Sequence, residues 1–388
     1  MKKVLIGLSG GVDSAVAAYL LKQQGYNVTA GFMKNYVAPS GNCTTYEDAE
    51  EAIKVANFLG IEIISFDLQK EYDEKILHYI YEGYKKGITP NPDVLCNTLI
   101  KFDVFLKKAL DLGFDYIATG HYARIDESKV ESLKSIKSKK NSTTGGLDRP
   151  DRLYRLLMGK DLNKDQSYFL SGLNQFQLSK SLFPIGGMSK PEVRAIASQI
   201  QLPNAERKDS QGLCFVGNIP IKKFLEQKLP KKIGSTITQD GKIVGQHDGA
   251  RFYTLGQRQG LNLAPDLFVT HIDVKKNIVT VGPRNDAALN QKIVHLQNRH
   301  RISKKYTFPL EITAKIRYRQ IPQPATLVQS PKSPSSLKSI KSKVRDMMTG
   351  GPDDLMTISF QETQRSIPPG QVAVAYIDDE CIGSGTIQ

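Results

Sequence analysis

The chain has 388 residues, 40% of them apolar, and a net charge of +14, which is typical of a soluble protein with two or three domains. No window holds about 18 consecutive uncharged apolar residues, so we expect no membrane span. The cysteines include no C-x-x-C pair, which argues against a zinc site and a disulfide scaffold and predicts a reducing, cytoplasmic location; they are Cys43, Cys96, Cys214 and Cys381. The positive charge favours a polyanionic partner, with nucleic acid as the obvious candidate.

Part of this charge lies in two related segments. The octapeptide SLKSIKSK occurs at 132–139 and again at 336–343, and the segments 129–150 and 331–354 together carry six of the 14 net positive charges. Polar Ser/Lys-rich units of this kind are typical of insertions, and we expect mobile surface loops, with basic arms that touch RNA phosphates as the alternative.

Strands and helices alternate over the first 120 residues. We expect strands at 3–8, 27–33, 61–67 and 116–121 and helices at 14–25, 46–60, 70–86 and 98–112. Repeated βα units of this kind predict an α/β fold with a doubly wound parallel sheet, whose ligands bind at the carboxyl ends of the strands.

The pattern changes towards the C-terminus. Helices are expected at 172–182 and 189–200, the second with Ser189 as its cap and Pro191 in its first turn. Beyond residue 205, short strands and turn residues predominate, including an Asp240-Gly241 hairpin signal. We therefore predict a nucleotide-binding domain (1–204), a small central β-rich domain (205–285) and a C-terminal β-barrel (286–388).

The stretch GLSGGVDS at 7–14 joins the first strand to the first helix. Small residues at such a turn let backbone N–H groups approach an anion, and the helix start adds unpaired donors. The loop has no lysine, so it is not the familiar G-x-x-x-x-G-K-[ST] phosphate loop, and Asp13 beside a polyphosphate predicts a bridging Mg²⁺. The alternatives are an ordinary glycine turn with Asp or Ser as the helix cap, or a secretory signal, which Asp13 and the short apolar run disfavour.

Further polar residues lie between the patterned elements, in TPNPDVLCN (89–97), TGHYAR (119–124), NKDQSYFL (163–170) and KDSQGLCFVG (208–217). We expect Asn91, Pro92 and Asp93 to form a rigid turn that presents Asp93 and Cys96 just before a helix, where the helix dipole favours a thiolate. The alternative for Cys96 and for Cys214 is a buried, inert cysteine.

Together these motifs resemble a known family. SGGVDS is the signature of the ATP pyrophosphatases, and its combination with ATGHYAR, LFPIGGMSKPEVR, YTLGQRQGL, IRYRQ and IPPGQVAV is similar to the tRNA-specific 2-thiouridylases of the MnmA type over essentially the whole chain. The resemblance implies three parts: a nucleotide-binding domain, a central domain and a barrel. It also implies ATP-dependent thiolation of the 2-position of the wobble uridine in tRNA, with adenylation of the 2-carbonyl and sulfur transfer from a persulfide.

The resemblance implies roles for individual residues. Cys214 would carry the persulfide, Cys96 would release sulfide or attack the persulfide, and Asp93 would transfer protons. A cysteine desulfurase or a relay of carrier proteins would supply the sulfur. The residues implied in binding ATP are Gly7, Leu8, Ser9, Gly10, Gly11, Val12, Asp13, Ser14, Met33 and Gly120, with Asp13 as the Mg²⁺ ligand. Those implied in contacting the target base and tRNA are Asn91, Pro92, Asp93, His121, Lys164, Asp165, Gln166, Arg317, Tyr318 and Gln371.

Alternatives remain open for one motif and for the function as a whole. RYR at 317–319 fits phosphate contacts with a stacking ring, or an exposed strand edge. The enzyme alternative is another ATP pyrophosphatase, such as a tRNA-modifying ligase with a nitrogen nucleophile, which needs neither Cys96 nor Cys214. The alternative of another class is a basic tRNA-binding protein without catalysis.

Overall fold

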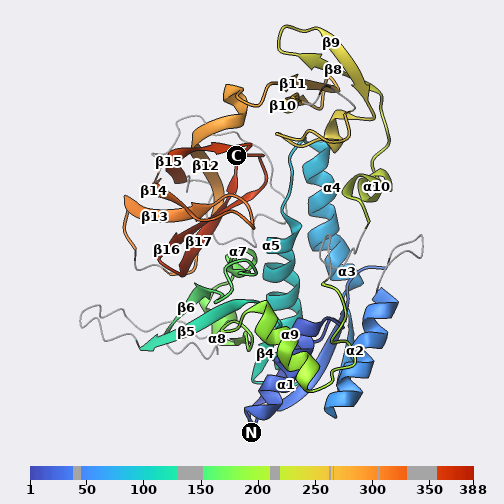
Figure 1. The fold of residues 1–388 in the computed structure, drawn as a ribbon, viewed down its shortest axis with the longest axis vertical. Helices are drawn as coiled ribbons and strands as arrows, with labels where there is room; N and C mark the ends of the chain where they lie inside the picture. The colour runs from blue at the N-terminus through green and yellow to red at the C-terminus, as the bar shows by residue number, and fades with distance from the viewer. Residues whose placement is uncertain are drawn as a thin grey trace, which may run out of the picture.

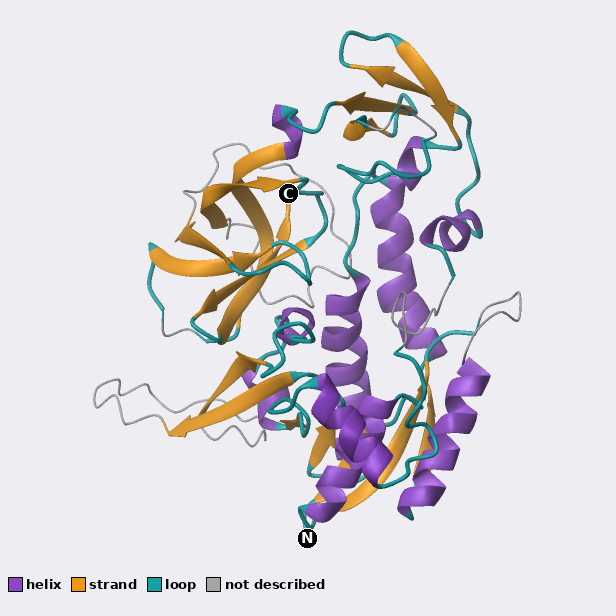
Figure 2. Cartoon of the chain, in the orientation of Figure 1, coloured by secondary structure: helices purple, strands orange, loops and turns teal. Residues whose placement is uncertain are grey.

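The computed structural model describes residues 1–37, 45–129, 152–209, 219–261, 264, 266–303, 306–329 and 356–388. The described chain forms a parallel sheet near the N-terminus, a small central sheet and a large antiparallel sheet that contains the C-terminus (Figures 1 and 2). Cys43, Cys214 and nearly all of the two repeat segments lie outside the described residues.

The first domain is a doubly wound α/β domain, as the alternating sequence pattern predicts. The strands of its first sheet, over the described residues, are all parallel and lie in the order β3-β2-β1-β4-β7. Val4 and Ile6 of β1 pack against α1, α2 and α9, whereas Leu5 packs on the other face against the helical residues 92–111. Because β1 is covered on both faces, its side chains are apolar on both. The elements are β1 (Lys3–Gly7), α1 (Val12–Gln23), β2 (Asn27–Lys34), α2 (Thr45–Leu59), β3 (Ile63–Asp67), β4 (Tyr116–Ala118), β7 (Ser181–Leu182) and α9 (Lys190–Gln199).

Two long helical runs lie side by side through the middle of the molecule (Figure 1). The first comprises α3 (Gln69–Tyr72), a π-helical segment (Asp73–Leu77) and α4 (His78–Lys85), and the second α5 (Pro92–Cys96), a π-helical segment (Asn97–Phe105) and α6 (Leu106–Asp111). The second run corrects the expected helix at 98–112, because it begins at Pro92. Proline suits the first helical position, where no N–H partner is needed, and the Asn91 side chain caps the run by accepting from the Val94 N–H at 3.3 Å.

The region after the first sheet also differs from expectation in one place. The predicted helix at 172–182 is shorter, since α8 (Gln175–Ser179) is followed by the edge strand β7. The helix expected at 189–200 is confirmed as α9, with Ser189 as its cap in a capping box with Glu192. The remaining elements here are β5 (Ala123–Lys129), β6 (Arg152–Met158) and α7 (Ser167–Leu170).

The central domain is a four-stranded mixed sheet in the order β10-β11-β8-β9 over the described residues. Gly241, at a φ of 85°, turns the predicted Asp240-Gly241 hairpin between β8 and β9. The Tyr81 ring of α4 stacks on Phe224 of α10 with centroids 5.3 Å apart, which fastens this domain to the first. The elements are α10 (Ile221–Glu226), β8 (Gly234–Thr238), β9 (Ile243–His247), β10 (Phe268–Asp273) and β11 (Ile278–Gly282).

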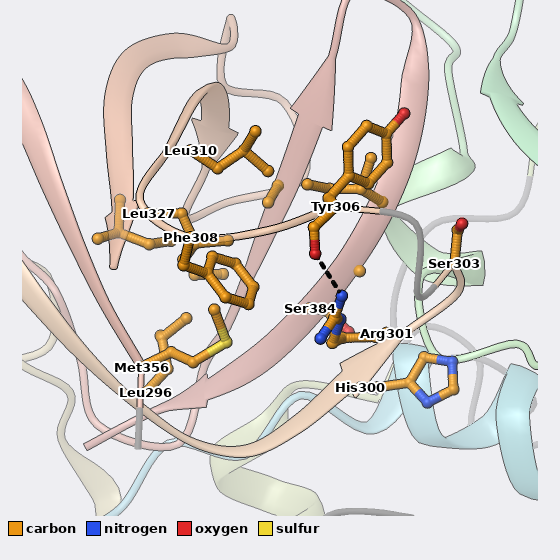
Figure 3. Close-up of a pocket in the computed structure, with 15 residues that line it drawn as sticks. Leu296, His300, Arg301, Ser303, Tyr306, Phe308, Leu310, Leu327, Met356 and Ser384 are labelled. Atoms are coloured by element: carbon orange, nitrogen blue, oxygen red, sulfur yellow. Dashed lines mark hydrogen bonds between the residues drawn. The ribbon is translucent and has the colours of Figure 1, made fainter. Parts of the chain in front are cut away.

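The last domain is an antiparallel barrel that pairing between β12 and β17 closes. Its elements are β12 (Asn290–Arg301), β13 (Leu310–Lys315), β14 (Gln323–Gln329), β15 (Met356–Arg365), β16 (Val372–Ile377) and β17 (Glu380–Ile387). The hairpin β5-β6 from the first domain joins the same sheet, because Leu157 and Leu156 pair with Glu380 and Cys381 of β17. The barrel core holds an apolar cavity of about 30 Å³, lined by residues such as Leu327, Phe308 and Met356 (Figure 3), which is room for little more than a water molecule.

Both repeat segments connect strands that pair with each other. Lys129 is the cross-strand partner of Arg152, and Gln329 is the cross-strand partner of Met356. Both pairs belong to the same eight-stranded sheet, and the paired strands reach the ends of each segment. Separately, no helix in the described part of the chain is long and apolar enough to cross a membrane.

Candidate functional site

The glycine-rich loop lies where β1 ends and α1 begins, at the carboxyl edge of the parallel sheet. Ser14 accepts a hydrogen bond from the Ser9 N–H at 3.2 Å and donates to the Gly11 carbonyl at 3.0 Å, so the loop is folded on itself. Gly11 caps α1 without a side-chain hydrogen bond, so the expectation of Asp or Ser as the helix cap is wrong. The loop leaves the first N–H groups of a 12-residue helix without side-chain caps, which is the arrangement that binds anions.

Close approaches of neighbouring atoms restrict the glycines of this site. Gly10 has a φ of 75°, and a Cβ there would lie 2.6 Å from the Arg207 guanidinium. A Cβ on Gly120 would lie 2.6 Å from the Ser14 nitrogen. Gly7 faces Met33, whose methyl carbon would be 3.1 Å from an added Cβ. The structure thus brings together the loop, Met33 and Gly120, for all of which the resemblance implies ATP binding.

A lysine distant in sequence approaches the loop. The Lys190 ammonium, at the start of α9, donates to both carboxylate oxygens of Asp13 at 2.8 and 3.0 Å, and its side chain is only 13% exposed. The Tyr122 hydroxyl donates to the same carboxylate at 2.7 Å, and burial together with this carboxylate raises the pKa of Tyr122. Neither Lys190 nor Tyr122 is among the predicted site residues. Lys190 belongs to the LFPIGGMSKPEVR motif, but nothing local in that motif indicates a contact with the loop.

Asp209 connects Lys190 with two further cations. Its carboxylate lies 2.6 Å from Lys190, 2.9 Å from Arg194 and 2.7 Å from Lys164, one of the predicted tRNA contacts. Burial opposes ionisation, but the hydrogen bonds from Lys164 and Lys190 outweigh it and lower the pKa of Asp209 to about 2. The glycine-rich loop and Lys164, a predicted tRNA contact, are therefore joined through Lys190 and Asp209.

Two further polar residues, Asn204 and Arg207, bind the backbone of the loop, and neither is a predicted site residue. The Gly10 carbonyl accepts hydrogen bonds from Asn204 at 2.8 Å and from Arg207 at 3.0 Å. Arg207 is itself fixed by Asp48 at 2.6 Å. Because both side chains donate to a backbone carbonyl of the loop, we expect them to stabilise its conformation.

The turn before α5 meets the C-terminal barrel. The Gln371 side chain donates to the carbonyls of Thr89 and Pro90 at 3.0 and 3.2 Å and accepts from the Asn91 side chain at 3.3 Å. Two predicted tRNA contacts, Asn91 and Gln371, are thus in direct contact although they come from different domains. The site at 89–93 is assembled by the docking of the barrel.

Asp93 and Cys96 do not precede a helix, and that expectation is wrong. Both lie inside α5, Asp93 half-buried in the first turn and Cys96 fully buried at the end of the element. The reason is that Pro92 and the Asn91 cap allow the helix to start four residues before Cys96. Cys214, the expected persulfide carrier, lies outside the described residues.

His121 packs against the helical run that carries Cys96, and its neighbour Gly120 packs on the glycine-rich loop. Its ring packs against Phe102 and Phe183, each with a centroid distance of 6.0 Å, and Thr119 is 2.7 Å from its Nδ1. Burial, with a contribution from Lys101, lowers the pKa of His121 well below its ordinary value, so the ring is neutral. A side chain 7% exposed does not reach a phosphate outside the protein, so in this conformation His121 supports the site from within.

Asp165 also differs from the expected surface contact, because it is a buried structural residue. It accepts hydrogen bonds from the backbone N–H groups of Gly159 and Ser167 at 3.0 Å, and from the Ser167 hydroxyl at 3.0 Å. Lys315 of β13 completes its shell at 2.9 Å, with 5% and 0% of the two side chains exposed. Its neighbour Gln166 is half-buried and accepts from the Tyr122 N–H at 2.9 Å.

Arg317 and Tyr318 lie in a turn after β13, so the alternative of a strand edge is wrong. Arg317 lines a cleft of about 400 Å³ between the central domain and the barrel, together with Arg365 and Thr254. The Tyr318 ring lies on Phe169 with centroids 4.2 Å apart. The Arg317 guanidinium donates to the carbonyls of Arg365 and Ser366, so the backbone fixes its position at the cleft.

Mg²⁺ takes one or two carboxylates and several water molecules or phosphate oxygens. Asp13 and Asp209 are carboxylates of that kind, and both lie beside Lys190. Among the described residues, no group of three or more His, Cys, Asp or Glu could hold a metal ion by itself. The donor set therefore fits a magnesium ion that arrives with a nucleotide.

Comparison with known proteins agrees with this architecture. Residues 2–218 match the family model described as the tRNA methyl transferase HUP domain, residues 222–283 the tRNA methyl transferase PRC-barrel domain, and residues 337–387 the aminomethyltransferase beta-barrel domain. The tRNA-specific 2-thiouridylase MnmA of Flavobacterium johnsoniae is 42% identical over 434 aligned positions, which cover all of both chains. That of Lysinibacillus sphaericus is also 42% identical, over 99% of this chain and 94% of that protein.

A solved structure, the U34-tRNA thiolase NcsA from Methanococcus maripaludis, is 18% identical with a TM-score of 0.33, over 58% of this chain and 63% of that chain. A likeness this weak adds nothing to the assignment. The full-length relatives and the three family models, in the same order along the chain, confirm the resemblance of the motifs. The chain belongs to the family of MnmA-type tRNA-specific 2-thiouridylases.

Proposed function

We propose that this protein is an ATP-dependent sulfurtransferase that thiolates the 2-position of the wobble uridine in tRNA. One observation carries the proposal: Gly120 packs on the glycine-rich loop, and its neighbour His121 packs on the helix that bears Asp93 and Cys96. Cys96 is six residues from Phe102 on that helix, at most about 9 Å along its axis at 1.5 Å per residue. The loop proposed to activate the nucleotide and the helical run that carries the Cys96 thiol are thus joined through two consecutive residues, Gly120 and His121.

ATP is proposed to bind at residues 7–14, Met33 and Gly120. The close backbone approaches at Gly10 and Gly120 fit a ligand gripped by main-chain N–H groups, and the first turn of α1 directs its dipole at the phosphates. Asp13 would hold Mg²⁺, which when bound neutralises charge on the phosphate oxygens.

The first half-reaction makes a leaving group. The 2-carbonyl oxygen of uracil is a poor leaving group, and adenylation turns it into a good one. The oxygen attacks the α-phosphorus of ATP, and the bond between that phosphorus and the oxygen bridging to the β-phosphorus breaks, which releases pyrophosphate. The loop N–H groups stabilise the charge that gathers on pyrophosphate. Asp93, half-buried in the first turn of α5, is proposed to transfer protons at the base.

The second half-reaction replaces oxygen with sulfur. The outer sulfur of a Cys214 persulfide attacks C2, and AMP departs with the former carbonyl oxygen. The Cys96 thiolate then attacks the Cys214 sulfur, which frees the 2-thiouridine and leaves a Cys96–Cys214 disulfide that an external thiol must reduce. Cys96 is buried, so this step requires the target base and Cys214 to approach it. A cysteine desulfurase or a sulfur-carrier protein is proposed to reload Cys214.

The target uracil must leave its stack in the tRNA to reach the glycine-rich loop and the helix that carries Asp93 and Cys96. Asn91, Pro92 and Asp93 are proposed to read it, because they lie at the junction that Gln371 closes. Lys164, Gln166, Arg317 and Tyr318 are proposed to contact the tRNA around this junction. His121 and Asp165 would act from inside the protein.

The test is mass spectrometry of nucleosides from unthiolated tRNA incubated with the purified protein, Mg-ATP, a desulfurase and cysteine. We expect 2-thiouridine that depends on ATP and is lost in Cys214→Ser. The double variant Cys96→Ser/Cys214→Ser separates the rivals, since a ligase with a nitrogen nucleophile would keep its activity. Binding of tRNA without pyrophosphate release would favour the non-catalytic alternative.

A further inference from the structure

Lys190 is held by groups that a polyphosphate can replace. Its ammonium lies between two carboxylates, 2.8 Å from Asp13 and 2.6 Å from Asp209. Asp13 is in the first turn of α1, two residues after the Gly11 cap, so the ammonium lies beside the N-terminal end of the helix that receives the loop. In contrast, Arg207 is bound to a loop carbonyl and cannot leave without releasing the loop.

The surroundings of Lys190 favour an incoming anion. Two carboxylates, Asp13 and Asp209, face three cations, Lys190, Lys164 and Arg194, within 3.0 Å. Asp161 also accepts from the Lys190 backbone N–H at 2.9 Å, so three carboxylates balance the three cations, and the positive end of the α1 dipole is what favours an anion here. An ammonium has three donors and no fixed geometry, so it can exchange a carboxylate oxygen for a phosphate oxygen without backbone movement.

We propose that Lys190 supplies the cation that this lysine-free loop lacks, by leaving Asp13 when ATP binds and contacting the β- and γ-phosphates. There it offsets the charge that develops on pyrophosphate when the bond to the α-phosphorus breaks. The same exchange frees the Asp13 carboxylate for Mg²⁺. The inference rests on the proposed function, since it assumes that the loop binds ATP.

The test is calorimetric titration of the full-length protein with ATP, pyrophosphate and AMP. AMP has no β- or γ-phosphate, so loss of Lys190 should weaken ATP and pyrophosphate binding by about tenfold to a hundredfold, as for a lost charged hydrogen bond, and leave AMP binding unchanged. Lys190→Arg should recover part of the loss. Lys160→Ala is the matched control, because Lys160 contacts the same helix through Glu192 at 3.1 Å but does not touch Asp13.

The outcomes separate this inference from the proposed function. A Lys190→Ala protein that loses ATP and AMP binding equally would show that Lys190 only holds the loop in shape, and an unchanged ratio of ATP to AMP affinity would likewise overturn the inference. If Lys190→Ala does not fold, the same ratio is measured in Lys190→Gln. Wild-type protein that binds no ATP would overturn the proposed function itself, whereas ATP-dependent thiolation with an unchanged affinity ratio would overturn the Lys190 role alone.

Discussion

The buried ion pair between Asp165 and Lys315 gives the sharpest prediction about stability. It joins the first domain to the barrel at 2.9 Å, with 0% of the Asp165 and 5% of the Lys315 side chain exposed. Asp165→Asn keeps the shape of the side chain and its acceptor for the Gly159 and Ser167 N–H groups. It replaces the oxygen that faces Lys315 with an amide N–H₂, which cannot accept a hydrogen bond.

The size of the effect follows from this geometry. At 2.9 Å and an effective dielectric constant of about 20, the attraction between the two charges is about 6 kcal/mol, part of which the desolvation of both ions offsets. Removing only one partner leaves the other charge buried, which costs about 3–5 kcal/mol. We expect Asp165→Asn to lower the free energy of unfolding by that amount. This is a large fraction of the stability of a typical domain, which totals about 5–15 kcal/mol.

Urea unfolding of the full chain, followed by circular dichroism, measures this loss, and a double-mutant cycle isolates the pair. Asp165→Asn combined with Lys315→Met should be more stable than the sum of the single variants predicts, because no charge is left unpaired. Lys85→Met breaks the surface pair with Glu82 and should leave the unfolding midpoint almost unchanged. Strictly additive single effects, or a stable Asp165→Asn protein that fails to bind tRNA, would refute the structural role argued for Asp165.

Three further predictions concern the loop, the buried histidine and the domain junction. Gly120→Ala should weaken ATP binding at least tenfold, because its Cβ would lie 2.6 Å from the Ser14 nitrogen. Gly187→Ala is the control, since nothing lies within 4 Å of its Cβ, and it should bind ATP like the wild type. Equal calorimetric titration curves for the two variants would contradict this. The pKa of His121 is lowered by burial, so the unfolded state binds the proton more tightly and stability falls as the pH drops below about 6.5, by about 1.4 kcal/mol per pH unit for this residue. In urea titrations at pH 7 and 5.5, His121→Gln should show a shallower pH dependence; an unchanged slope would count against a buried neutral ring. Gln371→Ala removes two hydrogen bonds to backbone carbonyls and should cost about 1–3 kcal/mol of stability, measured by the same unfolding assay, and tRNA affinity as well; a variant as stable as wild type would show that the junction does not depend on this residue.

Local pattern is enough to predict much of this fold. The alternation of apolar runs with helix signals predicts the parallel sheet, the Ser189 cap predicts α9, and the Asp240-Gly241 turn predicts the β8-β9 hairpin. Each of these signals lies within one element or one turn, so the sequence carries it directly. The helix start at Pro92 was also encoded locally, by Asn91 and Pro92, but the same residues are equally typical of a turn.

What the sequence determined by itself is therefore the order of the elements, the glycine-rich loop and, through its motifs, the family. Only the tertiary structure decided which side chains meet: Lys190 contacts Asp13 across 177 residues, Lys315 contacts Asp165 across 150, and Gln371 contacts Asn91 across 280. Such contacts depend on how the sheet, the helices and the barrel dock, and no periodicity or spacing records that. For the same reason, a lysine of α9 lies beside the lysine-free loop. Asp165, which its motif predicts to contact tRNA at the surface, is instead buried against the barrel.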